Sequence, residues 1–180
     1  MTLSQNYFQL FGLPEYYDID LTQLSENYRN IQRSTHPDRF ASASTQERLL
    51  SARYAADIND AYQTLRTPVK RATYLLTLKG VEWDAEQSRL VDPEFLMQQI
   101  SLREELEEIK KNSTDPESAL DQMNVTLESL MDKLARQFVV QIKNLDAKAE
   151  LEAIQTVNKM HFIAKIQYEA ERLEAELLDY

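Results

Sequence analysis

The side chains best suited to chemistry lie in one short segment, His36-Pro37-Asp38, in which a histidine and an aspartate flank a proline. A histidine near a carboxylate is a common acid–base pair in catalysis. Catalysis would also require a third, orienting group, an oxyanion site and a glycine-lined pocket, and the sequence offers no sign of them. Because the proline stiffens the segment, the two polar side chains have little freedom to lose when a partner binds. The segment therefore predicts a rigid recognition tip and no catalytic residues.

Basic residues stand on both sides of this tip. Arg29 and Arg33 are four positions apart and share one helix face with Gln32 beside them, and Arg39 follows the tip. An arginine pair of this kind is often only a solvated face, and Arg33 also favours a helix end through the helix dipole. Together with the tip, however, the basic face predicts a recognition surface for an acidic partner.

The composition favours helices and excludes several kinds of site. The chain has 180 residues, of which 43% are hydrophobic, so it can bury a core. Gly12 and Gly80 are the only glycines, whereas strands need turns that usually contain glycine. Without cysteine there are no disulfides or thiolate ligands, and His161 has no second ligand at metal spacing. We therefore expect an all-α fold with no metal site and no cofactor.

The net charge of −10 is unevenly distributed. Residues 1–75 hold eight basic and eight acidic side chains, whereas residues 76–180 hold twelve basic and twenty-two acidic ones. Nucleic acid and anionic membranes both require a positive surface, so the acidic half argues against either as a partner. No apolar stretch is long enough to cross a bilayer, and the start of the chain does not resemble a signal peptide. These features predict a bacterial-type cytoplasmic protein built from two modules.

Caps and breakers divide the N-terminal part into four helices, at about 6–11, 21–35, 45–67 and 69–79. Asp20 is the expected N-cap of the second helix, and Ser44 with Glu47 forms a capping box for the third. The second helix must end near residue 35, because Pro37 disfavours a helical conformation just before it. Apolar residues at steps of three or four should join the two long helices into a hairpin, namely Leu21, Leu24, Tyr28 and Ile31 on one and Ala52, Ala55, Ile58, Tyr62 and Leu65 on the other.

Two Asp-Pro pairs open helices in the C-terminal part. Asp92-Pro93 and Asp115-Pro116 each combine an N-cap with proline at the first helical position. They predict helices at about 93–111 and 116–144, and a last helix follows at about 146–178. Three long helices with short links are typical of an antiparallel bundle. The predicted domains are 1–75 for the hairpin module, 76–91 for a connector and 92–180 for a three-helix bundle.

The helix at 93–111 has two apolar faces, although a bundle needs only one. One face carries Phe95, Leu102, Leu106 and Ile109, and the opposite face carries Leu96, Met97, Ile100, Glu104 and Glu108. The second set is either core near one end of the bundle or an exposed patch that binds a partner. Periodicity alone leaves both alternatives open.

The string from Tyr28 to Phe40, which contains the His-Pro-Asp tip, resembles the end of the second J-domain helix and its loop. The resemblance implies that His36, Pro37, Asp38, Arg29, Gln32, Arg33 and Arg39 contact a DnaK-class ATPase and stimulate it. The chain has no Gly/Phe-rich linker and no paired CxxC repeats, so it does not resemble a general DnaJ.

The run Phe95 to Glu108 is very similar to the scaffold-binding helix of the HscB family, and the segments 6–14 and 71–76 also resemble that family. HscB-type proteins are J-domain co-chaperones of iron–sulfur cluster assembly. The resemblance implies binding of an IscU-type scaffold protein and its delivery to an HscA-type chaperone, without a cofactor. The scaffold-binding residues that it implies are Leu96, Met97, Ile100, Glu104, Glu108 and, from the last helix, Phe162.

Three rival interpretations make different predictions. A J-protein with another client would not lose scaffold binding when Leu96, Met97 and Ile100 become alanine. An enzyme that uses His36 and Asp38 would turn over a substrate without a partner. A coiled-coil adaptor would be indifferent to His36→Gln.

Overall fold

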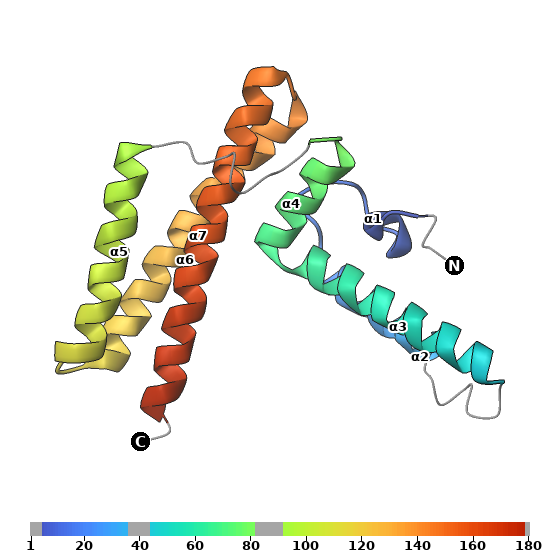
Figure 1. Ribbon diagram of the computed structural model, residues 1–180, viewed down its shortest axis with the longest axis horizontal. Helices are drawn as coiled ribbons and strands as arrows, with labels where there is room; N and C mark the ends of the chain where they lie inside the picture. Colours follow the sequence, from blue (N-terminus) through green and yellow to red (C-terminus); the bar gives the residue numbers. More distant parts are fainter. Residues whose placement is uncertain (1–4, 36–43, 82–91, 179–180) are drawn as a thin grey trace. The chain divides into compact units, whose positions relative to one another are not determined.

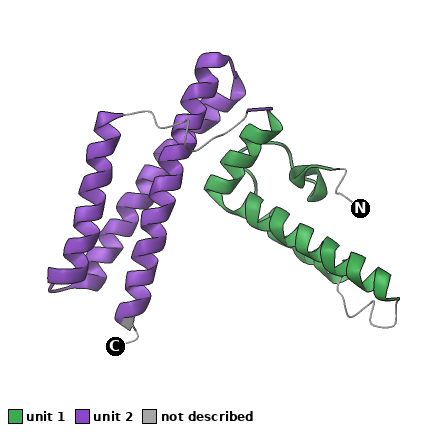
Figure 2. Ribbon diagram, viewed as in Figure 1, with its two compact units in different colours: residues 1–79 green, residues 80–180 purple. Residues whose placement is uncertain are grey.

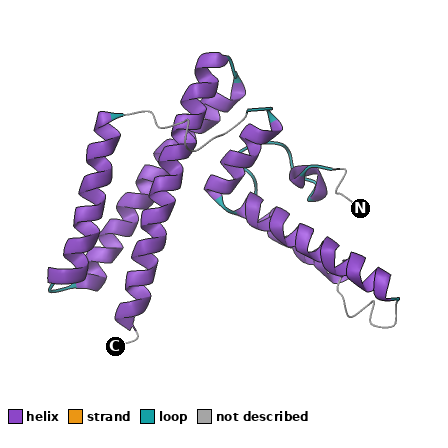
Figure 3. Ribbon diagram, in the orientation of Figure 1, coloured by secondary structure: helices purple, strands orange, loops and turns teal. Residues whose placement is uncertain are grey.

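The computed structural model describes residues 5–35, 44–81 and 92–178, and within these ranges the chain forms helices and loops without a strand (Figure 3). The prediction of an all-α fold is confirmed. The chain divides into two compact units, Met1–Lys79 and Gly80–Tyr180 (Figure 2). The His-Pro-Asp tip and Arg39 lie outside the described residues, so their predicted contacts stay predictions.

The first unit contains four helices, α1 (Tyr7–Leu10), α2 (Leu21–Thr35), α3 (Thr45–Arg66) and α4 (Pro68–Leu78), labelled in Figure 1. The predicted caps are present. The Asp20 carboxylate accepts hydrogen bonds from the backbone of Thr22 and Gln23, at 2.8 and 3.1 Å. Ser44 and Glu47 form the predicted capping box. The starts of α2 and α3 are therefore fixed by side chains next to them in the sequence.

Helices α2 and α3 form an antiparallel hairpin. The Tyr28 side chain of α2 is hydrogen-bonded to Asn59 of α3. One turn earlier on α2, Ser25 is hydrogen-bonded to Tyr62, which lies one turn later on α3. The largest fully buried side chains of this unit come from all four helices and the loop after α1: Phe8, Phe11, Leu24, Ile58, Leu65 and Leu76. Helices α1 and α4 thus pack against the hairpin through α3.

Arg71 of α4 is a buried cation, which no sequence pattern predicts. Its side chain is only 6% exposed, and Nη1 donates a hydrogen bond to the Leu65 carbonyl at 2.6 Å. The guanidinium also lies over the Tyr17 ring, 4.8 Å from its centroid. One arginine therefore satisfies a carbonyl in the last turn of α3 and packs the loop after α1 against α4.

Two residues of the predicted apolar stripes are exposed, which corrects the sequence analysis. Leu21 is 46% exposed and Ala52 is also exposed. The pairing of Tyr28 with Asn59 puts Leu21 opposite Arg66, the last residue of α3, and Ala52 opposite Thr35, the last residue of α2. Each stripe therefore reaches the last residue of the helix that covers it, where the cover ends. Helix α4 spans Pro68–Leu78, close to the predicted range of 69–79.

The second unit is a bundle of α5 (Pro93–Asn112), α6 (Pro116–Lys143) and α7 (Ala147–Leu178), which run alternately down and up in Figure 1. The Asp92 and Asp115 carboxylates cap α5 and α6 as predicted. The packing between α6 and α7 is the most extensive in the chain, and α5 packs less extensively against both. The core lies mainly between α6 and α7 and includes Leu120, Met123, Leu127, Phe138, Met160 and Ile163.

Candidate partner-binding surfaces

The basic face predicted on α2 is present. Arg29, Gln32 and Arg33 are all exposed, whereas Leu24 on the other side of the helix is fully buried. Arg29 and Arg33 line one shallow depression together with Glu26 and Asn30. The four-residue spacing therefore brings the two guanidinium groups to the same surface, from which charge-assisted hydrogen bonds to a partner's carboxylates are possible.

An aromatic stack fixes this part of α2 against α3. The rings of Tyr28 and Tyr62 are stacked with centroids 4.0 Å apart, and the Tyr28 hydroxyl donates to the Asn59 side chain at 2.7 Å. Gln32 Nε2 in turn donates to the Tyr28 hydroxyl at 2.7 Å. Gln32 is therefore linked to the hairpin by a hydrogen bond, and the backbone that carries Arg29 and Arg33 is held by the half-buried stack of Tyr28 on Tyr62.

The second face of α5 is an exposed apolar patch, here called the α5 patch and defined as Leu96, Met97 and Ile100. These side chains are 49%, 66% and 43% exposed. On the opposite face, Leu102 and Ile109 are buried. The α5 patch is therefore not part of the bundle core, which removes one of the two alternatives that periodicity left open. Contiguous exposed apolar side chains of this kind are typical of binding sites.

The α5 patch continues into an acidic surface. Glu104 and Glu108, one and two turns further along the same face, are exposed. Glu108 Oε2 accepts a hydrogen bond from the Asn112 side chain at 3.0 Å. The neighbouring Glu107 is paired with Lys111 at 2.6 Å, and this hydrogen bond lowers the pKa of the Glu107 carboxyl. The face thus presents apolar contacts at one end and carboxylates at the other.

Phe162, the predicted contribution of α7, lies against α5. It is half-buried, and its ring meets the Phe95 ring edge-on with centroids 5.7 Å apart. The Arg103 guanidinium lies over the Phe162 ring, 5.6 Å from its centroid. The structure therefore places Phe162 beside the helix that carries the α5 patch, at the junction of α5 and α7.

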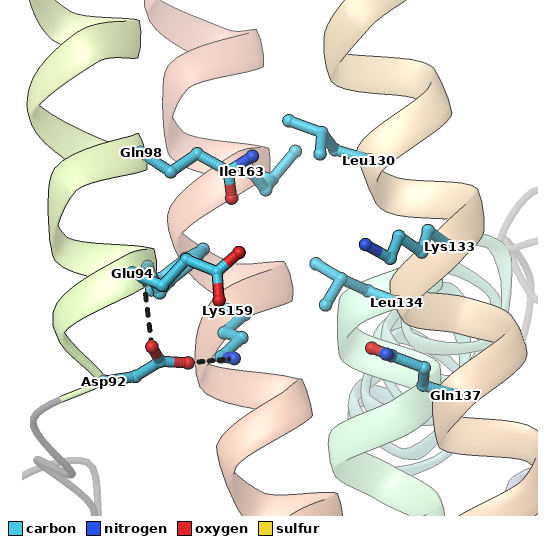
Figure 4. Close-up of a pocket in the computed structure, with 10 residues that line it drawn as sticks. Asp92, Glu94, Gln98, Leu130, Lys133, Leu134, Gln137, Lys159 and Ile163 are labelled. Carbon is cyan, nitrogen blue, oxygen red and sulfur yellow. Dashed lines mark hydrogen bonds and ion pairs between the residues drawn. The ribbon is translucent and has the colours of Figure 1, made fainter.

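The polar contact at the start of this junction was not predictable from local sequence patterns. Lys159 Nζ of α7 is 2.6 Å from Asp92 Oδ2, at the N-terminus of α5 (Figure 4). Nearby, a pocket of about 310 Å³ lies between the helices, lined by Glu94 and Gln98 of α5, Leu130 and Lys133 of α6, and Ile163 of α7, among others. The signal for Asp92 was its position as N-cap, but nothing local pointed to Lys159.

The described residues include no cluster of three or more histidine, cysteine or acidic side chains that would hold a metal ion. Within the same ranges, no helix has the length and apolar character needed to cross a membrane. What these residues do offer is two exposed candidate surfaces, one basic on α2 and one apolar and acidic on α5.

Comparisons with known proteins identify relatives of this chain. The C-terminal residues 91–171 match a family described as the HSCB C-terminal oligomerisation domain. A co-chaperone protein HscB homologue from Vibrio cholerae is 46% identical over 174 residues, which cover 96% of this chain and 99% of the relative. A homologue from Shewanella halifaxensis is 46% identical over 178 residues, which cover 97% of this chain and 99% of that relative.

Solved structures give the same result. The chaperone HscB from Vibrio cholerae superposes with a TM-score of 0.80 at 42% identity, covering 96% of this chain and 99% of the other. The human co-chaperone HscB has a TM-score of 0.82 and covers 100% of this chain and 86% of the other. Its identity of 23% supports the fold alone.

The fold and its two exposed surfaces define a co-chaperone with an N-terminal J-domain and a C-terminal helical domain. The chain belongs to the HscB family of co-chaperones. Co-chaperones act through a partner and are not themselves enzymes, so the prediction of a non-enzymatic protein is confirmed by this membership.

Proposed function

We propose that this co-chaperone binds an IscU-type iron–sulfur scaffold protein and delivers it to a DnaK-class chaperone of the HscA type, in a bacterial-type cytoplasm. The second unit binds the scaffold protein, through the α5 patch with Glu104, Glu108 and Phe162. The first unit docks on the chaperone through the His-Pro-Asp tip and the basic face of α2, and stimulates its ATPase. Iron–sulfur protein maturation is the process that this delivery supports.

The observation that carries the proposal is the exposure of the α5 patch. A bundle gains nothing from three large apolar side chains in water, and burying them against a partner would remove their apolar area from solvent. Methionine adapts its shape to a partner more readily than branched residues do, and Met97 is the most exposed of the three, at 66%. The carboxylates of Glu104 and Glu108 at the edge of the patch favour a partner with a basic rim.

Joining both surfaces in one chain gives the delivery its physical basis. Once the scaffold protein is bound, docking of the first unit on the chaperone brings the scaffold near the chaperone's client site at a raised effective concentration. Arg29 and Arg33 contribute attraction to an acidic chaperone surface, which increases the rate of encounter. Neither step needs covalent chemistry or a cofactor in this chain.

The test of scaffold binding is alanine replacement of Leu96, Met97 and Ile100 together, with affinity for the scaffold protein measured by calorimetry. We expect at least about a 100-fold loss of affinity, since apolar anchors at an interface often cost about 1–2 kcal/mol each. The matched control replaces Val125 and Val140, which are 67% and 71% exposed on α6 of the same unit, and should leave affinity unchanged. An unchanged affinity in the triple variant would refute the proposed surface.

A second candidate function for the same patch is contact between two copies of this chain, which the description of the matching C-terminal family favours. Light scattering of the wild-type protein and of the triple variant separates the two candidates. A monomer in both cases, with scaffold binding lost in the variant, supports delivery. A dimer that the triple substitution dissociates, without effect on scaffold affinity, supports self-association instead.

A further inference from the structure

The helix that carries the α5 patch is the least firmly packed helix of its bundle. It makes fewer contacts with α6 and α7 than these two make with each other. Along its first turns, a pocket of about 310 Å³ separates Glu94 and Gln98 from Leu130 and Lys133 of α6 (Figure 4). The N-terminal half of α5 therefore depends on α7 for its position.

One carboxylate at the start of α5 makes both of the contacts that fix this end. Asp92 Oδ1 accepts the backbone N–H of Phe95 at 3.1 Å, which caps the helix. Asp92 Oδ2 accepts a hydrogen bond from Lys159 Nζ of α7 at 2.6 Å, which joins the two helices. Both side chains are partly shielded from water, with 38% and 29% of their surfaces exposed. The hydrogen bond from Lys159 lowers the pKa of the Asp92 carboxyl.

The ion pair is the first of a series of contacts that leads along the junction. Lys159 Nζ lies over the Phe95 ring, 5.2 Å from its centroid, and the Phe95 ring packs edge-on against Phe162. Arg103, two turns further along α5, covers the Phe162 ring. The α5 patch begins one residue after Phe95, so its side chains are presented by the backbone that these contacts hold.

We propose that Asp92 and Lys159 are positioning residues for scaffold recognition, because their ion pair holds the N-terminal half of α5 on α7 in the arrangement that binds the scaffold protein. The inference rests on the proposed function of the α5 patch. A protein whose binding-competent arrangement is only partly populated binds with an affinity reduced by that fraction. Loss of the ion pair therefore weakens scaffold binding although neither residue belongs to the α5 patch.

The test uses substitutions in the full chain that remove the ion pair from either side. Lys159→Met keeps most of the side-chain stem and removes the charge, whereas Asp92→Asn removes the charge and keeps a good N-cap. Lys159→Arg retains the cation and serves as the conservative rescue. The matched control is Lys148→Met, which removes an ion pair with Glu152 that lies within α7 and does not involve α5.

Two quantities are measured for each variant, namely amide hydrogen exchange along α5 and affinity for the scaffold protein. In Lys159→Met and Asp92→Asn we expect exchange at residues 96–100 to accelerate about threefold to tenfold, and scaffold affinity to fall about twofold to fivefold. Exchange in α6 stays unchanged. Lys159→Arg and Lys148→Met behave as wild type in both measurements.

A double-mutant cycle distinguishes positioning from direct contact. If Lys159 acts through Asp92, the double variant binds the scaffold protein no more weakly than either single variant. Additive losses would overturn the inference, because they would mean that Lys159 contacts the scaffold protein itself. The two single variants could keep wild-type affinity while the alanine variant of the α5 patch binds poorly. That result would overturn the positioning role of Asp92 and Lys159 and leave the proposed function standing. Unchanged affinity in the alanine variant would overturn the proposed function, and this inference with it.

Discussion

Among single residues, Tyr7 joins α1 to both α3 and α4. Its backbone N–H donates to the Tyr74 hydroxyl of α4, and its own hydroxyl donates to Asp60 of α3, both at 2.9 Å. The rings of Tyr7 and Tyr74 are stacked with centroids 4.4 Å apart. Burial, and then the hydrogen bond to Asp60, raises the pKa of Tyr7 from 10.0 to about 12.

The raised pKa predicts a specific loss of stability in alkali. The folded state binds the Tyr7 proton more tightly than the unfolded state, so the stabilisation is complete below pH 10.0 and is lost as the pH rises towards about 12. We expect Tyr7→Phe to be less stable than wild type at neutral pH, since Asp60 loses its donor, but to lose less stability over this pH range. Urea unfolding followed by circular dichroism at several pH values measures the difference.

The control for this prediction is Tyr168→Phe, which changes a side chain that is 62% exposed in the second unit. Its stability should depend on pH as that of wild type does. Tyr74 also has a raised pKa because of burial, so some alkaline destabilisation remains in Tyr7→Phe. The same loss of stability between pH 10.0 and 12 in Tyr7→Phe and wild type would contradict the assignment to Tyr7.

At the level of helices, the sequence predicted the starts well and the lateral contacts poorly, for a physical reason. An N-cap is a contact between residues two or three apart, so Asp20, Ser44, Asp92 and Asp115 were identified from local spacing and are caps in the structure. The contact between Asp92 and Lys159 joins residues that are 67 positions apart. No local pattern encodes which lysine of a long helix meets a given carboxylate.

The same limit applies to apolar residues. On α5, two narrow and opposite faces define the second set, but periodicity alone leaves it as either core or a partner-binding patch, and its exposure is a finding of the structure. On α7, apolar residues lie on several sides, so the orientation of Phe162 depended on where α5 packs. Leu21 and Ala52 have the right spacing for burial but lie opposite the last residue of their partner helix, and spacing alone does not reveal where that partner ends.

The capping box of α3 gives a prediction at this scale, because it sets where the helix begins after residues 36–43. The Ser44 hydroxyl accepts the Glu47 backbone N–H at 3.3 Å, and Glu47 Oε2 accepts the Ser44 backbone N–H at 2.9 Å. Ser44→Ala should destabilise the start of α3 by about 1 kcal/mol, and Ser44→Gly by only a few tenths. Hydrogen exchange in the first two turns of α3 measures the effect, and equal exchange in wild type and Ser44→Ala would contradict it.

For the whole molecule, the proposed assignment of one partner to each unit rests on the distribution of charge and of exposed apolar area. The first unit holds nine basic and eight acidic side chains and has a basic face on α2, whereas the second holds eleven basic and twenty-two acidic side chains together with the α5 patch. Two surfaces of different character in separate compact units suit two different partners. This distribution was visible in the sequence, whereas the exposure of the α5 patch required the structure.

The central claim is that one chain couples scaffold binding to stimulation of a chaperone's ATPase. It is tested most directly by steady-state ATP hydrolysis by a DnaK-class chaperone of the HscA type, with this protein, with the scaffold protein, and with both. We predict that the two together stimulate hydrolysis more than the sum of their separate effects. His36→Gln should abolish this synergy, and the Leu96/Met97/Ile100 alanine variant should weaken it while leaving stimulation by the co-chaperone alone intact. The claim would be contradicted if this protein stimulated hydrolysis and the scaffold protein added no further stimulation.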